Sequence, residues 1–573
     1  MKHPISRRQM KRIVDRMTTR SLSKLTKRTL KALKATVRRD DLSLSSALTG
    51  NEKESWLEAV RVEIDSLFNV TKTLVPETPD PSSDYDVIHS TLVLKKKMKN
   101  EHEIDKYKAR LCGCGNQLND KRDYTNETYS PTVNALVHSL LLQMMVVDQM
   151  HAASYDTIAA YLHQEYPSSL KPLYIRFPRA IALALHLDPD QLYRVKRYIY
   201  GLPDAGRAYY LALSQHLMNN GYVKSASDPC LFHTINKENR TYLWSHVDDL
   251  FCISTDANEL QKLHDILASK FPVKMNTEVT SHLGIQLEKT NDGSLKLTQP
   301  KLLHELFQEY VKHPLKTFAT KYPSTSRKKK GSALLCDKYQ YLRLMGKLLF
   351  LTASRPDIMT SVSFGAMKNV SPTADDYDDL LQIVQYLYTT RDLGLTLYPP
   401  KHPKDNIKLV AYVDASYLVH DDASSHTGFT IGITGCGTGE PKSFFHTKSQ
   451  KQKLISTSST HAEMKALYEL TITLIFVANL LEELKRPIDL PVMIYEDSQP
   501  TIDLINQSIC SGSNRSKHFI MLTRFVKEQV EKGLIEIRKI AGEKNIANVL
   551  TKTITGREFN DSFNKIMGTA HSQ

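Results

Sequence analysis

The sequence predicts a multidomain α+β and α/β protein in which two large lobes are joined by a helical connector. The chain has 573 residues, too many for one hydrophobic core, which suggests about three to five packed units. Helical periodicity dominates residues 339–393. The last third alternates strand-like and helical runs in the order βββαβαβ, which is typical of an α/β domain of roughly 150 residues.

Positive charge is concentrated at the beginning of the chain. Residues 1–40 contain fourteen Lys and Arg against Asp15 and Asp40, while the whole chain carries a net charge of +14. We therefore assign 1–42 as a basic, partly disordered tail. Two explanations remain open: a segment that binds nucleic acid or directs nuclear import, and a solvated linker.

The first lobe is expected to open with a helix and a charged hairpin. A helix over about 43–75 would place Trp56, Val60 and Ile64 on one face. A loop at 76–86 precedes an apolar strand at 92–94 that ends in three lysines, and a second strand follows at 107–111. Two strands with cations at their ends predict a positively charged hairpin.

The last third is expected to form its own domain. The predicted strands are 409–413, 428–433, 443–446, 491–495 and 534–540, and the predicted helices are 460–484 and 517–532. A polar, lysine-rich stretch at 325–332 separates the first lobe from the helical connector, since such a composition is hard to bury.

Several classes of protein are disfavoured by the sequence. The longest apolar stretch, Leu136–Val147, is shorter than the roughly 20 residues of a membrane span, so we expect a buried helix and no membrane partner. No apolar segment follows Met1 as in a secretory signal. Seven scattered cysteines fit a reducing compartment, and the spacing of Cys112 and Cys114 is not that of a zinc site.

A first group of carboxylates centres on His246-Val247-Asp248-Asp249. Apolar runs on both sides predict two strands meeting at a tight turn, with the acids at its tip. Adjacent carboxylates repel each other unless a cation neutralises them, although an ordinary polar turn has the same pattern. Asp156 ends another apolar strand, five residues before Tyr161.

A second group of carboxylates lies in the last third. Asp414 ends its first strand, Glu463 lies early in the long helix, and Asp497 ends a later strand. Acids at the ends of neighbouring strands and on a crossing helix can converge on one pair of metal ions. Each acid alone is more typical of the protein surface, so the prediction depends on all three together.

Both groups and several flanking motifs resemble copia-type retrotransposon polyproteins, in their reverse transcriptase plus ribonuclease H region. The resemblance covers about residues 43–567. The motifs that carry it are Trp56-x-x-Ala59-x-x-x-Glu63, Lys106-Tyr107-Lys108-Ala109-Arg110-Leu111, Tyr155-Asp156, Tyr200-Gly201-Leu202, Val247-Asp248-Asp249, Leu283-Gly284-Ile285 and Ser354-Arg355-Pro356-Asp357-Ile358.

This resemblance implies a right-hand polymerase with fingers, palm and thumb, a helical connector, and a C-terminal ribonuclease H-like domain. The implied limits are 43–272 for fingers and palm, 273–324 for primer grip and thumb, 325–404 for linker and helical connection, and 405–568 for the ribonuclease H-like domain. No Cys/His knuckle and no Asp-Thr/Ser-Gly triplet is found. We therefore expect the distal part of a polyprotein.

The resemblance also implies two Mg²⁺ ions per active site, with Mn²⁺ as a substitute. Nucleotidyl transfer needs two such ions about 3.5–4 Å apart, and Mg²⁺ prefers hard oxygen ligands. The implied catalytic and metal-binding residues are Asp156, Asp248 and Asp249 for the polymerase and Asp414, Glu463 and Asp497 for the nuclease. Asn548 stands where the family has a fourth nuclease carboxylate. We expect it to be a weak ligand that reduces cleavage, because an amide brings no charge.

Substrate-binding residues follow from the same resemblance. Lys95, Lys108 and Arg110 are candidates for the triphosphate, although solvated strand-end cations have the same pattern. Tyr161 matches the residue that stacks under the sugar, with a core tyrosine as the alternative. The last two candidates are Gly201, in the loop before the second palm helix, and His518, which lies in a segment (Arg515-x-Lys517-His518) near the hybrid or in a basic helix start.

Three positions depart from the family besides Asn548. His246 replaces a tyrosine beside the acid pair, Asp204 replaces a glutamine where it would face the triphosphate, and 112–115 differs from the usual sequence. These changes leave the metal ligands in place but alter the predicted nucleotide pocket.

The expected function is RNA-directed DNA synthesis with a fused ribonuclease H. The partners would be an RNA template, a DNA primer, RNA–DNA hybrid, deoxynucleoside triphosphates and other products of the polyprotein. The expected location is the cytoplasm, in virus-like particles, with the nucleus as the alternative. A decayed or host-adopted copy that binds nucleic acid without catalysis is the competing hypothesis.

Overall fold

The computed structural model describes residues 44–98, 104–118, 128–236, 239–311, 322–323, 333–335, 337–400, 407–435, 439–507 and 517–571. The predictions for the basic tail and for the linker at 325–332 lie outside these residues.

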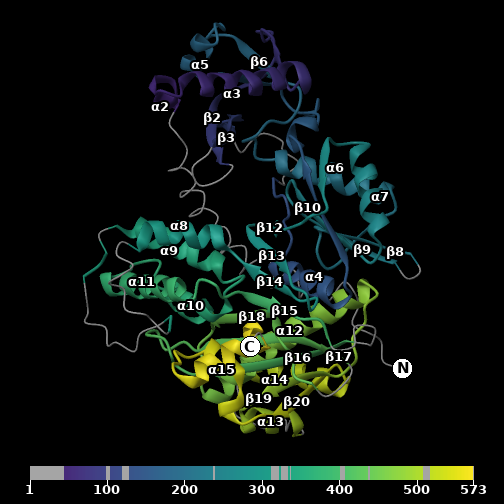
Figure 1. Ribbon diagram of the computed structural model, residues 1–573, viewed down its shortest axis with the longest axis vertical. Helices are drawn as coiled ribbons and strands as arrows, with labels where there is room; N and C mark the ends of the chain where they lie inside the picture. Colours follow the sequence, from purple (N-terminus) through teal and green to yellow (C-terminus); the bar gives the residue numbers. More distant parts are fainter. Residues whose placement is uncertain are drawn as a thin grey trace.

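A five-stranded sheet of order β1-β6-β5-β2-β3 forms the upper end of the molecule in Figure 1. Its strands are β1 (Leu74–Pro76), β2 (Asp86–Met98), β3 (Ile104–Gly113), β5 (Leu173–Arg176) and β6 (Leu192–Val195). Strands β2 and β3 pair antiparallel, so the predicted charged hairpin is confirmed. Helix α5 (Arg179–Ala184) lies in the same region.

The opening helix differs from its prediction in extent. Residues 44–70 form α2 (Leu44–Thr49), α3 (Lys53–Asp65) and a π-helical turn η1 (Ser66–Val70). Gly50 lies between α2 and α3, where its low helix propensity favours a break. Trp56, Val60 and Ile64 are buried as predicted.

A six-stranded sheet of order β11-β4-β10-β9-β8-β7 forms the middle of the molecule. Its strands are β4 (His151–Thr157), β7 (Val223–Lys224), β8 (Leu231–Asn236), β9 (Asn239–His246), β10 (Asp249–Ser254) and β11 (Val273–Asn276), and its helices are α4 (Ala135–Val147), α6 (Ala205–Asn219) and α7 (Ala257–Ala268). Alternate residues of β10 face opposite sides of the sheet. Leu250 and Cys252 pack with α6 and α7, while Phe251 and Ile253 pack with α4.

A third sheet and four helices connect the two ends of the chain. The sheet has the order β12-β13-β14-β15, with β12 (Ser281–His282), β13 (Ile285–Lys289), β14 (Leu295–Thr298) and β15 (Leu395–Leu397). The helices are α8 (Pro300–Tyr310), α9 (Lys338–Leu351), α10 (Met359–Ala366) and α11 (Ala374–Thr389). The motif Ser354-Arg355-Pro356-Asp357-Ile358 lies in this connecting region and has a structural role, because Arg355 and Asp357 form a buried ion pair of 2.7 Å.

The last third forms a five-stranded sheet of order β18-β17-β16-β19-β20 at the lower end of Figure 1. Its strands are β16 (Ile407–Ser416), β17 (His426–Gly435), β18 (Phe444–Lys451), β19 (Val492–Glu496) and β20 (Ile535–Lys539). The long helix α12 (Ser459–Glu483) and α14 (Lys517–Glu531) confirm the predicted helices. The sequence did not predict α13 (Gln499–Asn506) or α15 (Arg557–Met567).

The palm-like sheet and the last domain contact each other directly. Helix α4 packs into the same apolar cluster as α12 and strands β16 and β17. Polar contacts also cross this boundary: Tyr242 Oη donates to the Leu484 carbonyl at 2.9 Å, and Arg486 pairs with Asp148 at 3.1 Å. The carboxylate of Glu483 on α12 accepts hydrogen bonds from the Ser225 and Ser227 hydroxyls and from the Ala226 amide. The sequence predicted two lobes joined by a connector, and this direct junction was missed.

The predicted mixed α+β and α/β multidomain class is confirmed. The domain limits stay predictions: β11 begins at Val273, just beyond the expected end of the palm at 272, and still pairs with β4.

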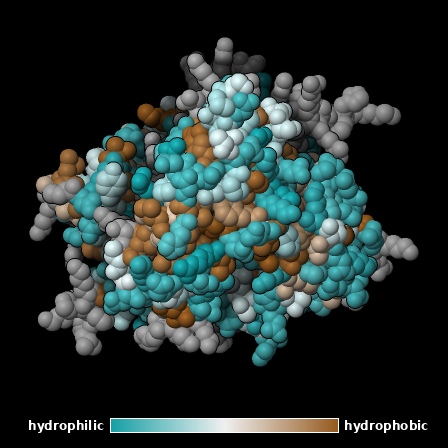
Figure 2. Space-filling view, turned by 90° about the horizontal axis from the view of Figure 1, so that it is seen from above, coloured by the Kyte–Doolittle hydropathy of each residue, from teal (hydrophilic) through white to brown (hydrophobic). Residues whose placement is uncertain are grey.

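One helix in the described part of the chain, α12, has the length and composition of a membrane span. Most of its most apolar stretch is buried within the protein, and it packs on β16 and α14 as a core helix. Figure 2 looks down on the upper end of the molecule, where apolar residues gather near the centre of the face and hydrophilic residues surround them.

Candidate active sites

The first group of carboxylates meets where β4 and β10 pair. Asp156 lies directly opposite Asp249 in this antiparallel pair, and residues opposed in this way have Cα atoms about 4.5–5.5 Å apart. Asp248 lies in the two-residue turn between β9 and β10, and its carbonyl accepts a hydrogen bond of 3.4 Å from the Thr157 amide. Folding thus brings Asp156 next to an acid pair that follows about ninety residues later in the chain.

The turn that carries Asp248 has a strained backbone. Val247 has φ of +63°, and a β-branched residue rarely adopts this left-handed conformation. Such strain costs on the order of 1–3 kcal/mol and persists only where the surrounding structure enforces it. Here the paired strands β9 and β10 hold the turn between them.

The three carboxylates share one electrostatic field. Burial raises the pKa of Asp249, and the neighbouring Asp248 and Asp156 raise it further. Asp156 and Asp249 are nevertheless exposed, and Asp248 is half-buried. This group is therefore open to solvent, and its mutual repulsion favours binding of a cation.

His246 is half-buried and lies near the buried imidazoles of His138 and His282. Burial lowers the pKa of His246, His138 (to about 4) and His282 (to about 3). The rings of His138 and His282 are 5.3 Å apart, and Phe251 packs 4.6 Å from His282. His246 therefore lies in surroundings that disfavour its charged form.

The predicted triphosphate cations lie on the β2–β3 hairpin. Lys95 is directly opposite Lys108 in the pairing and is exposed. Burial lowers the pKa of Lys108, with Arg110 and Lys97 adding to the effect, while the acids Glu63 and Asp156 raise it. Lys108 therefore lies within the electrostatic reach of the palm acid.

Arg110 and Tyr161 lie beside the same tyrosine. The guanidinium of Arg110 stacks 5.0 Å from the ring centre of Tyr200, and Tyr161 packs edge-on against Tyr200 at 5.4 Å. Burial and then Asp248 raise the pKa of Tyr161. Tyr161 is thus half-buried between the cationic hairpin and the acid pair.

Gly201 is needed where β3 meets the loop before α6. It has φ of +91°, and an added Cβ would collide with the Gly113 carbonyl oxygen. The Gly113 amide donates to the Tyr200 carbonyl at 2.7 Å. Nearby, Asp204 accepts a hydrogen bond of 2.9 Å from Tyr198, so this unexpected acid has a protein partner.

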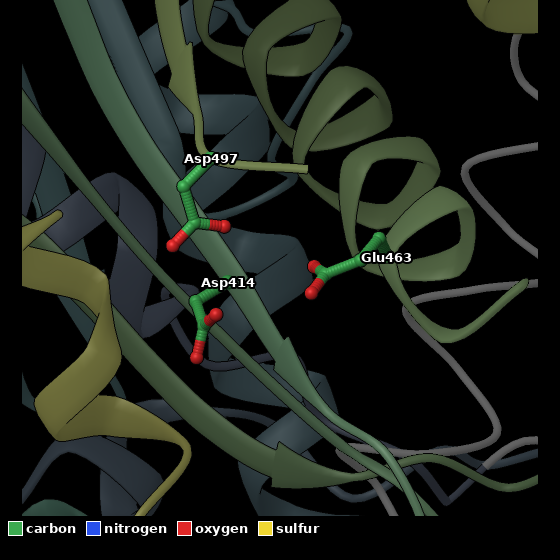
Figure 3. A group of neighbouring side chains, drawn as sticks. All are labelled: Asp414, Glu463 and Asp497. Carbon is green, nitrogen blue, oxygen red and sulfur yellow. The ribbon is translucent and has the colours of Figure 1, made fainter. Parts of the chain in front are cut away.

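The second group converges at one edge of the last sheet. Strands β16 and β19 are parallel neighbours, so their carboxyl ends meet at the same edge. Asp414 lies near the end of β16, Asp497 follows β19, and α12 crosses the sheet with Glu463 in its second turn. The ligand oxygens of these three residues lie within 4.8 Å of one another. Figure 3 shows their carboxylates facing a common point.

Burial dominates the electrostatics of this second group. Asp414 is 1% exposed, and burial raises its pKa, as does Asp497, while Lys552 and Thr551 lower it. Lys552 lies 3.4 Å from Asp414, and the Thr551 hydroxyl donates to the same carboxylate. Burial raises the pKa of Glu463 well above its ordinary value, and neighbouring carboxylates raise it further.

Asn548 lies on the short helix η6 (Ile546–Leu550) beside this group. Its Nδ2 donates to the Gly542 carbonyl at 2.7 Å, and Gly542 in turn adjoins Asp497. Its Oδ1 is buried without a hydrogen-bond partner. The side chain therefore keeps an oxygen that a cation can use, but it brings no charge.

Sequence reasoning missed Glu496, a fourth acid in this region. Glu496 is fully buried in β19; its Oε1 accepts a hydrogen bond of 2.8 Å from the Ser498 amide, and its Oε2 has no partner. The alternation of buried Val492, Ile494 and Glu496 along β19 was the available signal.

The donor set of the second group fits a divalent cation with hard oxygen ligands. Oε2 of Glu463, Oε2 of Glu496 and Oδ1 of Asn548 are all buried without hydrogen-bond partners, and buried polar atoms rarely remain unpaired. Lys552 is the one cation in the described residues within 4.0 Å of a carboxylate in this group. Arg515 lies outside the described residues, and the side chain of His518 is not described.

Comparison with known proteins agrees with this arrangement. Residues 73–320 match the family model "Reverse transcriptase (RNA-dependent DNA polymerase)". The chain is 27% identical over 528 residues to the retrovirus-related Pol polyprotein from transposon RE2 of Arabidopsis thaliana, covering 91% of this chain and 34% of that protein. It is 25% identical over 536 residues to the corresponding polyprotein from transposon TNT 1-94 of Nicotiana tabacum, covering 91% and 38%. The chain thus spans about a third of the length of these relatives.

Solved structures give distant similarities. A foamy viral protease-reverse transcriptase in complex with double-stranded DNA has a TM-score of 0.46 at 12% identity, covering 84% of this chain and 69% of that one. An LC11-RNase H1 in complex with an RNA/DNA hybrid has a TM-score of 0.19 at 17% identity, covering 28% and 99%.

The fold is that of a mixed α/β multidomain protein, and residues 73–320 within it are similar to reverse transcriptases. Over most of its length the chain is similar to the Pol polyproteins of copia-type retrotransposons from plants.

Proposed function

We propose that this chain is an RNA-directed DNA polymerase with a fused ribonuclease H. The observation that carries the proposal is the register of β4 and β10, which sets Asp156 opposite Asp249 and next to Asp248. The polymerase substrates would be an RNA template, a DNA primer and deoxynucleoside triphosphates. The nuclease substrate would be the RNA strand of the resulting hybrid.

In the polymerase site, Asp156, Asp248 and Asp249 would hold two Mg²⁺ ions, or Mn²⁺ as a substitute. Bound there, such ions supply Lewis acidity and neutralise the charge of the triphosphate. Lys108 and Arg110 provide positive charge on the facing hairpin and would orient the phosphates. Lys95 would add charge at the exposed side of the hairpin.

Other residues of the chain would position the nucleotide and the hybrid. Tyr161, half-buried between Tyr200 and Tyr209, would form the floor under the sugar and exclude a 2′-hydroxyl. Gly201 keeps the loop close to β3. His518, at the start of α14, would contact the hybrid.

In the nuclease site, Asp414, Glu463 and Asp497 would hold a second pair of ions. Asn548 lacks the charge that the family supplies at that position, so we propose weakened metal binding and reduced cleavage.

Primer extension on a poly-rA template tests the polymerase proposal. Synthesis with Mg²⁺ or Mn²⁺ should appear with the unmodified chain and disappear in Asp248→Asn. If neither protein extends the primer while the unmodified chain binds the template, the competing function gains: a nucleic-acid-binding protein without catalysis. The altered residues Asp204, His246 and Asn548 are the observations that favour that alternative.

Cleavage of an RNA–DNA hybrid by the unmodified chain beside Asn548→Asp tests the nuclease proposal. We expect faster cleavage in the variant. Equal, full-strength cleavage by both would refute the weakening by Asn548.

Location and further partners belong to the proposal. We propose action within virus-like particles in the cytoplasm, together with other products of the polyprotein, with nuclear entry as the alternative.

A further inference from the structure

The nuclease site holds one more acid than its three converging ligands, and this acid is the fully buried Glu496. In a water-free environment a carboxylate is costly unless it is paired with a cation. Oε1 of Glu496 is satisfied by the Ser498 amide, whereas Oε2 is buried without a partner. One oxygen of this side chain is therefore left without a hydrogen-bond partner in the protein.

The side chain of Glu496 lies on the face of β19 that is turned toward Glu463. Val492 and Ile494, on the same face of β19, pack in the apolar cluster that contains α12, while Met493 and Tyr495 pack in the cluster on the other face. Glu496 thus faces α12, and among the neighbouring charges it has the largest influence on Glu463. Oε2 of Glu463 is likewise buried without a hydrogen-bond partner.

The charge of the site indicates what Glu496 contributes. Asp414, Glu463 and Asp497 supply three negative charges toward two divalent ions, and position 548 supplies none because it is Asn. Glu496 lies outside the set of three whose oxygens converge within 4.8 Å, so we assign it charge balance behind Glu463 and not direct ligation. Charges so placed act strongly at low dielectric.

We infer that Glu496 is the fourth acidic group of the nuclease metal site and supplies, from the α12 side, the negative charge that Asn548 lacks. This inference rests on the proposed nuclease function and names the residue that sustains metal binding in it. Glu496 is a positioning residue, because it acts on the ions through Glu463 and the field of the site.

Binding of Mn²⁺ to the full chain without nucleic acid, measured by calorimetry, tests the inference. Glu496→Gln keeps the acceptor for the Ser498 amide and removes only the charge. We expect about tenfold weaker Mn²⁺ binding, as for other outer-shell groups of metal sites, and slower hybrid cleavage. The matched control is Glu469→Gln, a carboxylate on the same helix α12 that accepts a hydrogen bond of 2.7 Å from Gln450 away from the site. It should leave Mn²⁺ binding unchanged.

A charge-relocation variant separates charge from structure. In Glu496→Gln/Asn548→Asp the charge returns at the position where the family has it, and Mn²⁺ affinity should recover to within about threefold of the unmodified chain. If Glu496→Gln weakens Mn²⁺ binding and the double variant gives no recovery, the inference that Glu496 supplies the charge missing at position 548 is overturned.

Asp414→Asn distinguishes failure of the inference from failure of the proposed nuclease. If Asp414→Asn weakens Mn²⁺ binding and Glu496→Gln does not, Glu496 has no part in the metal site while the nuclease proposal stands. If neither variant changes Mn²⁺ binding, the nuclease site itself is refuted, and the inference with it.

Discussion

The two groups of carboxylates differ in how far they are buried. The palm group lies on the surface: Asp156 on β4 and Asp249 on β10 are exposed, and β10 follows the strained turn at Val247. The nuclease group is buried, with Asp414 at 1% exposure and its oxygens already gathered with those of Glu463 and Asp497. Among the described residues, only the nuclease group brings three acids this close. The comparison shows one group of acids that the fold leaves open to solvent and another that the fold gathers within a buried site.

The junction between the two regions should give the largest effect on stability. The side chain of Asp148 is buried at the end of α4 and forms ion pairs with Arg486 of the last domain and with Arg240 of β9, each at 3.1 Å. Asp148→Ala leaves two largely buried cations without this partner, so we expect a loss of about 3–5 kcal/mol in unfolding free energy. Urea unfolding measures it. The matched control is Asp265→Ala on the exposed face of α7, expected to change little. A loss no larger than that of the control would mean that the two regions are not coupled here.

Removing one acid from each group sharpens the contrast between buried and exposed sites. Glu463→Gln removes a charge from a buried, repelling group and should stabilise the metal-free protein by about 1–3 kcal/mol at mildly alkaline pH. Asp249→Asn removes an exposed charge and should change stability by less than about 0.5 kcal/mol. Thermal unfolding in the presence of a chelator measures both. Equal effects would contradict the contrast.

The pH dependence of stability should come from the buried group. Burial raises the pKa of Asp414 and Glu463 above their ordinary values of 3.8 and 4.5, so between the ordinary and the raised pKa the folded state binds more protons than the unfolded state. Their contribution to stability is therefore complete below the ordinary pKa values and is lost as the pH rises through the raised ones. The difference in melting temperature between the unmodified metal-free chain and Glu463→Gln should widen as the pH rises above about 4.5. Added Mg²⁺ should reduce this difference, and a constant difference would contradict the assignment.

The strained turn of the palm should give the smallest effect. Val247→Gly relieves the left-handed backbone conformation at the expense of more freedom in the unfolded chain, so we expect a gain of up to about 1 kcal/mol. Primer extension by the same variant should fall if the strained turn positions Asp248. Val93→Gly, at a regular strand position of β2, should instead destabilise the protein.

Much of the fold could be predicted from local patterns. The turn between β9 and β10 was evident because apolar runs flank its acids, and helix α12 was predicted within one residue at each end from its 3.6-residue periodicity. Asp156, Asp414 and Asp497 were found because they end or follow apolar strands.

What the sequence missed depends on contacts between distant segments. Strand β15 has three residues and pairs with β14, about a hundred positions earlier. No local sequence pattern therefore predicts it. The junction at Asp148 joins two regions separated by more than three hundred residues. Glu496 was not predicted because the resemblance places the metal-binding carboxylate at its neighbour, Asp497.

The account's central claim is that the fold builds two separate catalytic centres, and a crossed assay tests it most directly. Asp248→Asn and Asp414→Asn are each measured for primer extension on poly-rA and for cleavage of an RNA–DNA hybrid, beside the unmodified chain. We predict that Asp248→Asn loses synthesis and Asp414→Asn loses cleavage, each by at least about a hundredfold, while the other activity persists. If either substitution removes both activities, or if neither changes the activity assigned to it, the claim of two separate centres is contradicted.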